Sequence, residues 1–308
     1  MTAGIVNENY EIVGKLTWAT RLPRPAEDLE KALADLCRTV ARDNKVDFAD
    51  IKYVGIGTPG SVNFTTGFVG FNTNFGYYDW NLGPDLEALL GCKVYVENDT
   101  RAMTYGEYMC GVGNNEDTMI FVNASWGLGV GLVIDRKLFY GRSGFSGEFG
   151  HFPLLDNEVI CRCGKRGCLE TGASGSAVHR IFMEKLAQKR VSMLSDKYNR
   201  GEQILLEDIL EALGQEDVLA IEVMETVGHT LGKAMAGLIN LFNPDLIVLG
   251  GTLAVAKDYI MLPLKSAINK YSLQLVNKDT TIKLSKLGEK AGAVGACMLS
   301  RSKMLGLM

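Results

Sequence analysis

The sequence is poor in histidine, has no excess of positive charge and lacks a long apolar run. Only three of its 308 residues are histidines, and 36 Asp and Glu outnumber 32 Lys and Arg, for a net charge of −4. A surface of this sign repels nucleic-acid phosphate, so these residues alone are a poor candidate for binding DNA. No run approaches the ~20 apolar residues of a membrane-spanning helix, and the N-terminus has no signal-peptide pattern. We therefore expect a cytoplasmic protein.

The cysteines exclude a disulfide framework. There are seven, an odd number in a long chain without a signal peptide. Four of them are scattered and fit small buried apolar positions. The other three fall within eight residues and are considered below. At roughly 100–200 residues per domain, the length suggests two lobes.

Strands and helices alternate along the chain, which predicts an α/β fold. Apolar residues recur at helical spacing over 26–43 and 217–242, and a glycine-rich helix is expected over 288–302. Short apolar strands are expected at 53–57, 93–97, 118–124, 132–134 and 246–249, with a glycine-rich loop at 127–131.

One internal similarity concerns two hairpins. Gly4-Ile5-Val6, with Gly14 ten residues after Gly4, resembles Gly131-Leu132-Val133, with Gly141 ten residues after Gly131. A strand and a glycine-rich loop precede the second copy. If the repeat is real, a strand and a loop should also precede the first copy, and the sequence would begin in the middle of a hairpin.

The most specific motif is a group of three cysteines in a short loop with two glycines. Three thiolates at this spacing converge on one tetrahedral metal, and Zn²⁺ prefers sulfur and imidazole ligands. His151, ten residues upstream, is the candidate fourth ligand. Four protein ligands leave no open position, so such a zinc would be structural. The alternative is a reduced thiol cluster without metal. The predicted ligands are His151, Cys161, Cys163 and Cys168.

Polar residues follow two of the expected strands. Asn98 and Asp99 come directly after the strand 93–97, where ligands bind in α/β proteins. Asp99 could act as a general base on a hydroxyl group while Asn98 binds a polyol. The alternative is a helix N-cap or a turn. Glu148 and Glu170 flank the cysteine loop, and with His151 they suit a cluster of sugar hydroxyls.

Two glycine pairs could form a nucleotide site. Gly127 and Gly129 could present backbone N–H groups to a phosphate. Gly250 and Gly251 could admit a base against bare backbone. The alternative for both pairs is a tight turn.

Together these motifs resemble the ROK family of repressors and sugar kinases. The resemblance runs from Gly4 to about Ala296, and its most specific part is the segment from Gly147 through Glu170 that contains the cysteines. It implies a two-lobed, actin-like (duplicated ribonuclease H-like) α/β fold with the sugar in a cleft. A small lobe would cover 1–98, with the helix 288–308 packed back on it, and a large lobe would cover 99–287. The implied sugar contacts are Asn74, Asn98, Asp99, Glu148, His151 and Glu170, with Asp99 as the base.

Two departures distinguish the chain from the family's kinases. Their phosphate-binding Asp-x-Gly-Gly-Thr-Lys loop is absent, and Trp126 stands where their second phosphate loop has a threonine. The pattern resembles the family's NagC/XylR-type repressors, in which a kinase-like body senses a sugar. We therefore expect the body of a sugar-responsive transcriptional regulator. The alternative is an ATP- and Mg²⁺-dependent sugar kinase.

The resemblance also implies partners. They are a monosaccharide or sugar phosphate and further copies of the chain in a homodimer or higher homo-oligomer. DNA would be bound only through a helix-turn-helix domain preceding Met1, and no membrane is implied.

Overall fold

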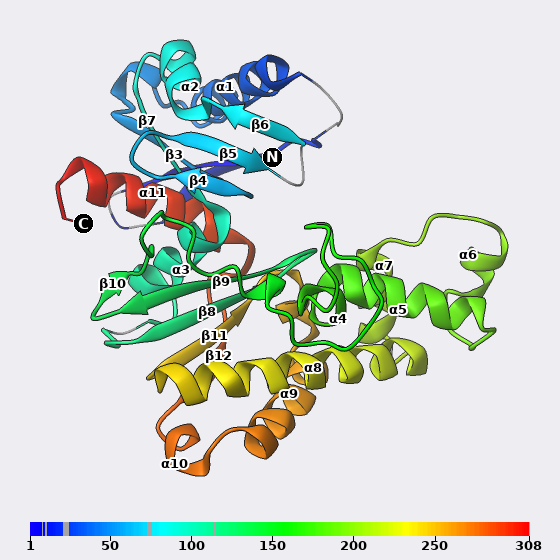
Figure 1. Cartoon of the computed structure of the whole chain (residues 1–308). Coiled ribbons are helices and arrows are strands. Elements are labelled where there is room, and N and C mark those ends of the chain that lie inside the picture. The colour runs from blue at the N-terminus through cyan, green and yellow to red at the C-terminus, as the bar shows by residue number, and fades with distance from the viewer. Residues whose placement is uncertain (8, 10, 21–24, 73–75, 114, 308) are drawn as a thin grey trace. The chain divides into compact units, whose positions relative to one another are not determined.

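The computed structural model describes residues 1–307 except 8, 10, 21–24, 73–75 and 114. It divides into two compact units, coloured along the chain in Figure 1. The first unit comprises Met1–Asn115, Gly131–Ser146 and Glu289–Met308, and the second comprises Glu116–Val130 and Gly147–Gly288. Residues 99–115 thus group with 1–98 by their contacts. The lobes 1–98 and 99–287 stay a prediction.

The strands of the first unit form three small sheets. β1 (Thr2–Val6) and β2 (Ile12–Thr17) are an antiparallel hairpin. β3 (Tyr53–Thr58) and β7 (Lys93–Asn98) are a parallel pair. The third sheet is an antiparallel meander of β4 (Ser61–Asn63), β5 (Phe68–Asn72) and β6 (Tyr77–Trp80). Within the described residues, β1 pairs only with β2, and β3 only with β7.

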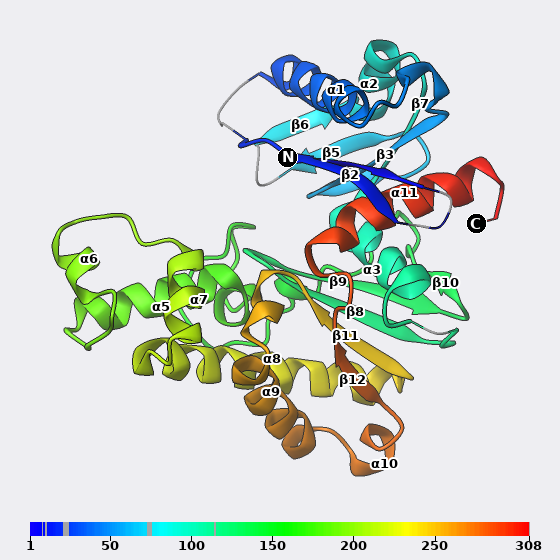
Figure 2. The same cartoon turned by 180° about the vertical axis from the view of Figure 1, so that it is seen from behind.

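Helices cover both faces of the β3–β7 pair. α1 (Ala26–Asp43) and α2 (Leu82–Leu90) lie on one face, and α11 (Ala291–Met304) lies on the other and beside the β1–β2 hairpin (Figures 1 and 2). α11 can approach β3 closely because Gly55 has no side chain. A Cβ there would lie 2.2 Å from the Ala296 carbonyl oxygen. α11 also packs against α3 (Asp99–Cys110).

The sheet of the second unit is built on parallel strands. β11 (Leu246–Gly250) lies between β8 (Met119–Ala124) and β12 (Thr281–Leu284), so that Val248 is level with Phe121 and Lys283. Every residue of β8 and β11 is buried, as expected for strands covered on both faces. β9 (Leu128–Ile134) follows on the other side of β8 and continues into the first unit, where it pairs with β10 (Lys137–Leu138).

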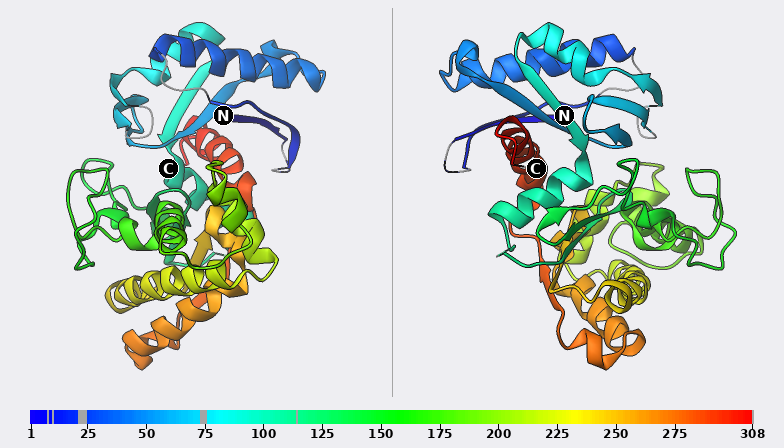
Figure 3. Two further views of the ribbon diagram at one scale, coloured as in Figure 1. Left: turned by 90° about the vertical axis from the view of Figure 1, so that its right-hand side faces the viewer. Right: turned by 60° about the vertical axis from the view of Figure 1, so that its left-hand side comes forward.

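The helices of the second unit are longest near its C-terminal part. α8 (Val218–Phe242) begins at the N-cap Asp217 and ends at Asn243, whose φ is 43°, just before Pro244. α9 (Asp258–Tyr271) runs alongside it (Figure 3). The remaining helices are α4 (Glu170–Ala173), α5 (Gly175–Ala187), α6 (Ser195–Asn199), α7 (Leu206–Gly214) and α10 (Gln274–Asn277).

Most expected elements occur within a few residues of their predicted bounds, with one correction. The segment 127–131 was expected to be a loop, but β9 begins at Leu128. Gly129 therefore lies in a strand, because Leu128 and Val130 are buried in alternation with it. No helix in the described ranges combines the length and the apolar character needed to cross a membrane.

Candidate functional site

Four soft donors converge in the second unit. The ligand atoms of His151, Cys161, Cys163 and Cys168 all lie within 4.8 Å of one another. The Cys161 Sγ lies 3.5 Å from the His151 Nδ1, and the Cys163 Sγ lies 3.6 Å from the Cys168 Sγ. A tetrahedral site with Zn–S bonds of about 2.3 Å has S–S separations of about 3.8 Å. The donor set and its spacing therefore fit a metal-binding cluster of the Cys3His type.

The thiols of this cluster differ in their acidity. Burial raises the pKa of Cys161 to about 12. Burial also acts to raise the pKa of Cys163, but hydrogen bonds from the Lys165 backbone amide and the neighbouring thiols outweigh it, and that pKa is lowered. Cys163 is also the exposed member of the four. The loop thus favours one thiolate, which is the form that binds metal.

Glu148 and Glu170 each lie close to one member of the cysteine cluster. The Glu148 Oε2 is 3.8 Å from the His151 Nε2, while the other ring nitrogen of His151 faces the thiols. The Glu170 Oε1 is 3.9 Å from the Cys161 Sγ, and its Oε2 accepts a hydrogen bond of 2.9 Å from the Leu128 N–H. The cluster therefore holds together the three side chains that were predicted to bind sugar hydroxyls in this unit.

The loop between β8 and β9 is fixed to the same region and carries an exposed aromatic side chain. The backbone carbonyls of Ser125 and Trp126 accept hydrogen bonds from Gly175 and Ser176. Trp126 is 40% exposed, and its ring centroid lies 5.8 Å from that of His179. The Arg162 guanidinium also lies 5.8 Å from the Trp126 ring centroid. A bulky, partly exposed indole thus stands in this loop, close to an imidazole and to a guanidinium group.

The two predicted glycine pairs lie near the carboxyl ends of β8 and β11 in the second unit. Gly127 precedes β9 and Gly129 lies within it, whereas Gly250 ends β11 and Gly251 follows it. Gly251 has a φ of +83°, and a Cβ there would lie 2.6 Å from the Ser125 Oγ. The Ser125 Oγ in turn accepts a hydrogen bond from the Thr252 N–H. Packing of Gly251 against Ser125 is therefore sufficient to explain why a glycine stands at this position. A role of these glycines in binding a nucleotide stays a prediction.

Asn98 and Asp99 join β7 to α3 in the first unit. The Asn98 Oδ1 accepts the Arg101 N–H at 3.1 Å, and its amide donates to the Gly60 carbonyl. Asn98 is therefore the N-cap of α3, as one interpretation of the sequence expected. The Asp99 Oδ1 accepts a hydrogen bond of 2.7 Å from the Thr100 N–H. Burial raises the pKa of Asp99, and the hydrogen bonds from Thr100 act against it. A carboxylate with a raised pKa is the stronger base.

A buried ion pair behind these two residues was not found from the sequence. The Arg101 Nε donates to the Glu97 Oε1 at 2.8 Å, and both side chains are at least 96% buried. The Tyr140 hydroxyl donates to the other oxygen of Glu97. Burial raises the pKa of Tyr140. The i, i+4 spacing of Glu97 and Arg101 was a readable signal, whereas Tyr140 is distant in sequence. Asn74, the remaining predicted sugar contact, lies outside the described residues.

The match to known proteins decides the family. The model of the ROK family matches residues 1–303. The chain belongs to the ROK family. This ROK chain is 31% identical to a glucokinase of Thermotoga maritima. The match covers 99% of this chain and 95% of the glucokinase.

Two solved structures of ROK proteins resemble the chain closely. One is a ROK family glucokinase from Streptomyces griseus in complex with glucose and AMPPNP, with a TM-score of 0.86 and 29% identity over 97% of this chain and 95% of that one. The other is a ROK family transcriptional regulator, a homologue of the E. coli MLC protein, with a TM-score of 0.84. It is 29% identical over 98% of this chain and 75% of the regulator's chain. The predicted α/β, actin-like ROK fold is confirmed.

Proposed function

We propose that this ROK chain is the sugar-binding body of a sugar-responsive transcriptional regulator. The observation that carries the proposal is Trp126, which is exposed in the loop after β8. By the family resemblance, this loop should present a small hydroxyl residue to phosphates. An indole fills that space and cannot donate the same hydrogen bond. The sugar-binding residue types, in contrast, are all present.

The proposed recognition uses charged and polar groups on vicinal hydroxyls. In the second unit these are Glu148, His151 and Glu170, and in the first unit they are Asn98 and Asp99. Carboxylates accept two hydroxyl hydrogen bonds each, which gives a sugar its orientation. We propose Zn²⁺ at His151, Cys161, Cys163 and Cys168, where it would hold the loop that carries these residues and supply no reactive position.

Calorimetry with glucose, xylose, N-acetylglucosamine and the 6-phosphates of the two hexoses tests this function. We expect one of them to bind, and Glu170→Ala to weaken that affinity about ten- to a hundredfold because a charged hydrogen-bond partner is lost. Glu184→Ala is the matched control, since Glu184 is an exposed partner of Arg180 on α5. An unchanged affinity in Glu170→Ala would contradict the assignment.

A second candidate is an ATP- and Mg²⁺-dependent sugar kinase, and Asp99 favours it. Its carboxylate stands at the start of α3 with a raised pKa, as suits a base that deprotonates a sugar hydroxyl. Under this candidate, Gly127, Gly129, Gly250 and Gly251 would line the ATP site. An ADP-release assay with the best-binding sugar and Mg-ATP separates the two functions. Turnover near 1 s⁻¹ or faster that Asp99→Asn abolishes would establish the kinase. Sugar binding without turnover supports the regulator.

The proposal extends to partners and location. We propose a cytoplasmic homo-oligomer that contacts DNA only through a domain outside residues 1–308. Sedimentation of the purified chain with and without the bound sugar measures the oligomeric state.

A further inference from the structure

Trp126 is an exposed aromatic residue on a firmly held loop of the second unit. Its carbonyl accepts a hydrogen bond of 3.0 Å from the Ser176 N–H, and the Ser125 carbonyl accepts one of 2.7 Å from the Gly175 N–H. The Ser125 N–H donates to the Gly127 carbonyl at 3.1 Å. These bonds fix the backbone on both sides of the indole, which is nevertheless 40% exposed. A rigid, exposed indole offers a ligand a large contact area at little cost in entropy.

Polar groups flank this indole. The Arg162 guanidinium carbon lies over the ring, 5.8 Å from its centroid. The His179 imidazole lies at the same centroid distance, with the two ring planes at 53°. The His179 Nε2 is 2.9 Å from the Ile204 carbonyl oxygen, so the imidazole is held in place. Arg162 belongs to the loop of the cysteine cluster, which therefore positions the guanidinium beside the indole.

The indole is also close to a carboxylate that we propose to bind sugar. The Leu128 N–H donates to the Glu170 Oε2 at 2.9 Å, and a Cβ at Gly127 would lie 2.8 Å from the same oxygen. Because consecutive Cα atoms are about 3.8 Å apart, the Trp126 Cα lies within about 8 Å of this oxygen. Gly127 stands between the two and has no side chain. A ligand can therefore extend from Glu170 to the indole over bare backbone.

This surface has the chemistry of a site for a second sugar ring. A pyranose presents C–H groups on its faces and hydroxyl groups at its rim. The indole matches the apolar face, and the guanidinium carries planar N–H donors for the rim hydroxyls. A phosphate group would match the guanidinium but not the indole, since it has no apolar face to cover the ring.

We propose that Trp126 binds the second ring of a disaccharide whose first ring is held by Glu148, His151 and Glu170. The inference rests on the proposed sugar-binding function and adds the ligand class, which is a sugar of at least two rings. The indole stacks on one face of the second ring, and Arg162 donates to its hydroxyl groups. Trp126 thus determines specificity by the length of the ligand.

Calorimetry tests the proposal with glucose, xylose and N-acetylglucosamine and with disaccharides built from them: cellobiose, maltose, isomaltose, xylobiose and chitobiose. We expect at least one disaccharide to bind about tenfold or more tightly than its monosaccharide. Trp126→Ala should reduce this preference to below about threefold, and Trp126→Phe should keep part of it. The matched control is Tyr271→Ala, because Tyr271 is 39% exposed on α9 of the same unit. It should leave the preference unchanged. A preference that survives in Trp126→Ala would overturn the proposal.

Glu170→Ala separates failure of this inference from failure of the sugar function. If a monosaccharide binds through Glu170 but no disaccharide binds more tightly, the sugar function stands and the assignment of Trp126 is wrong. If no sugar binds, the sugar function itself fails, and this inference fails with it.

Proton NMR of the bound ligand locates the contact. The C–H protons of the second ring should shift upfield on binding because they lie over the indole, and Trp126→Ala should abolish that shift. Tighter binding without an upfield shift would place the second ring elsewhere and overturn the proposal. If adenine protons of ATP shift instead, and no disaccharide protons do, the indole belongs to a nucleotide site and the proposal is wrong.

Discussion

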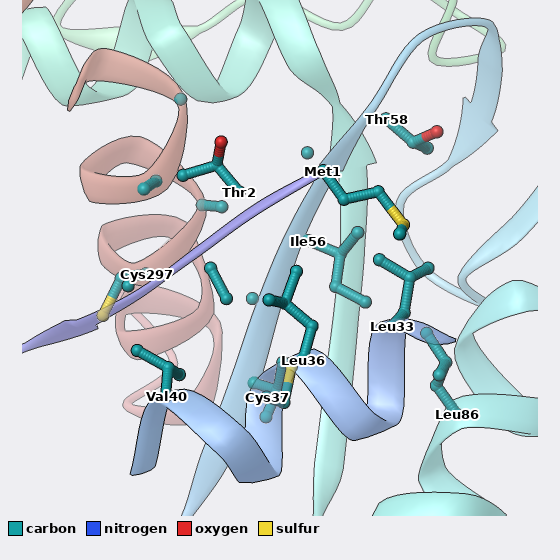
Figure 4. A pocket seen from close by; sticks show the side chains of 18 of the residues that line it. Met1, Thr2, Leu33, Leu36, Cys37, Val40, Ile56, Thr58, Leu86 and Cys297 are labelled. Atoms are coloured by element: carbon teal, nitrogen blue, oxygen red, sulfur yellow. The ribbon is translucent and has the colours of Figure 1, made fainter. Parts of the chain in front are cut away.

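Both units contain parallel strands, but those of the second unit form one continuous sheet, whereas the strands β1 to β7 of the first unit form three small ones. In the second unit, β8 lies between the start of β9 and β11, and all its residues are buried. In the first unit, β3 pairs with β7 alone among the described residues, borders an apolar groove lined by Leu33, Leu36 and Cys37 among others (Figure 4) and is half-buried over most of its length. A central strand stabilises a sheet because it forms backbone hydrogen bonds with a neighbour on each edge and buries apolar side chains on both faces. We therefore expect the second unit to have the larger free energy of unfolding.

The largest loss of stability is expected from a change in the cysteine cluster. If the cluster binds a structural metal, the folding of the second unit depends on that metal. Cys168→Ser removes a buried ligand, and we expect a loss of more than about 5 kcal/mol of unfolding free energy, because a structural zinc site contributes about 10–16 kcal/mol. Metal analysis and denaturant unfolding measure it, with Cys110→Ser outside the cluster as the control. Hydrogen exchange should show the loss in β8 and β11 rather than in β3. If the variant keeps the wild-type stability and no zinc is found in the wild type, the metal assignment fails.

The next effect is expected from the buried ion pair of the first unit. Glu97→Ala leaves the Arg101 guanidinium buried without its carboxylate, and we expect a loss of about 3–5 kcal/mol. Urea unfolding measures the change. The control is Asp35→Ala, which removes an exposed pair with Arg38 and should cost less than about 0.5 kcal/mol. Equal effects of the two substitutions would show that the first unit does not depend on this pair.

A matched pair of valines compares the two sheets directly. Val248 of β11 is fully buried, whereas Val54 of β3 is half-buried and borders the groove. We expect Val248→Ala to cost about 2–3 kcal/mol and Val54→Ala less than about 1 kcal/mol. Denaturant midpoints of the two variants measure the difference. Equal losses of unfolding free energy would mean that the packing of β3 beside the groove is as tight as that of β11.

The smallest effect concerns pH. Burial raises the pKa of Cys37 from 9.0 to about 11. The folded chain then holds a proton that the unfolded chain releases, so the stability falls as the pH rises from about 9 through 11. Below pH 9 this group causes no change. Cys37→Ala should remove that part of the alkaline slope in unfolding experiments. A slope unchanged by the substitution would show that the thiol is hydrated in the groove.

Local patterns in the sequence predicted much of the fold and part of the candidate site. The helix expected at 26–43 has those bounds, because its apolar residues repeat at helical spacing. The cysteine loop and His151 come together as predicted, since their spacing is short and their chemistry specific. Asn98 proved to be a helix cap, which leaves fewer of its groups for a ligand.

What the sequence could not predict depends on contacts between distant segments. Strands β4, β5 and β6 are short and mix polar with aromatic residues, so no alternation marks them. The hydrogen bond between Tyr140 and Glu97 joins residues 43 positions apart. The groove follows from which strand edges have partners, and no local pattern in the sequence records that.

Trp126 also gives the protein an optical reporter. Of the three tryptophans, Trp18 and Trp80 belong to the first unit, and Trp126 alone belongs to the second. Trp126 is 40% exposed, whereas Trp80 is 5% exposed, so iodide should quench Trp126 in preference to Trp80. After Trp18→Phe and Trp80→Phe, the remaining emission comes from one known place beside the cysteine cluster. Events in the second unit can then be followed by light in this double variant, without an attached dye.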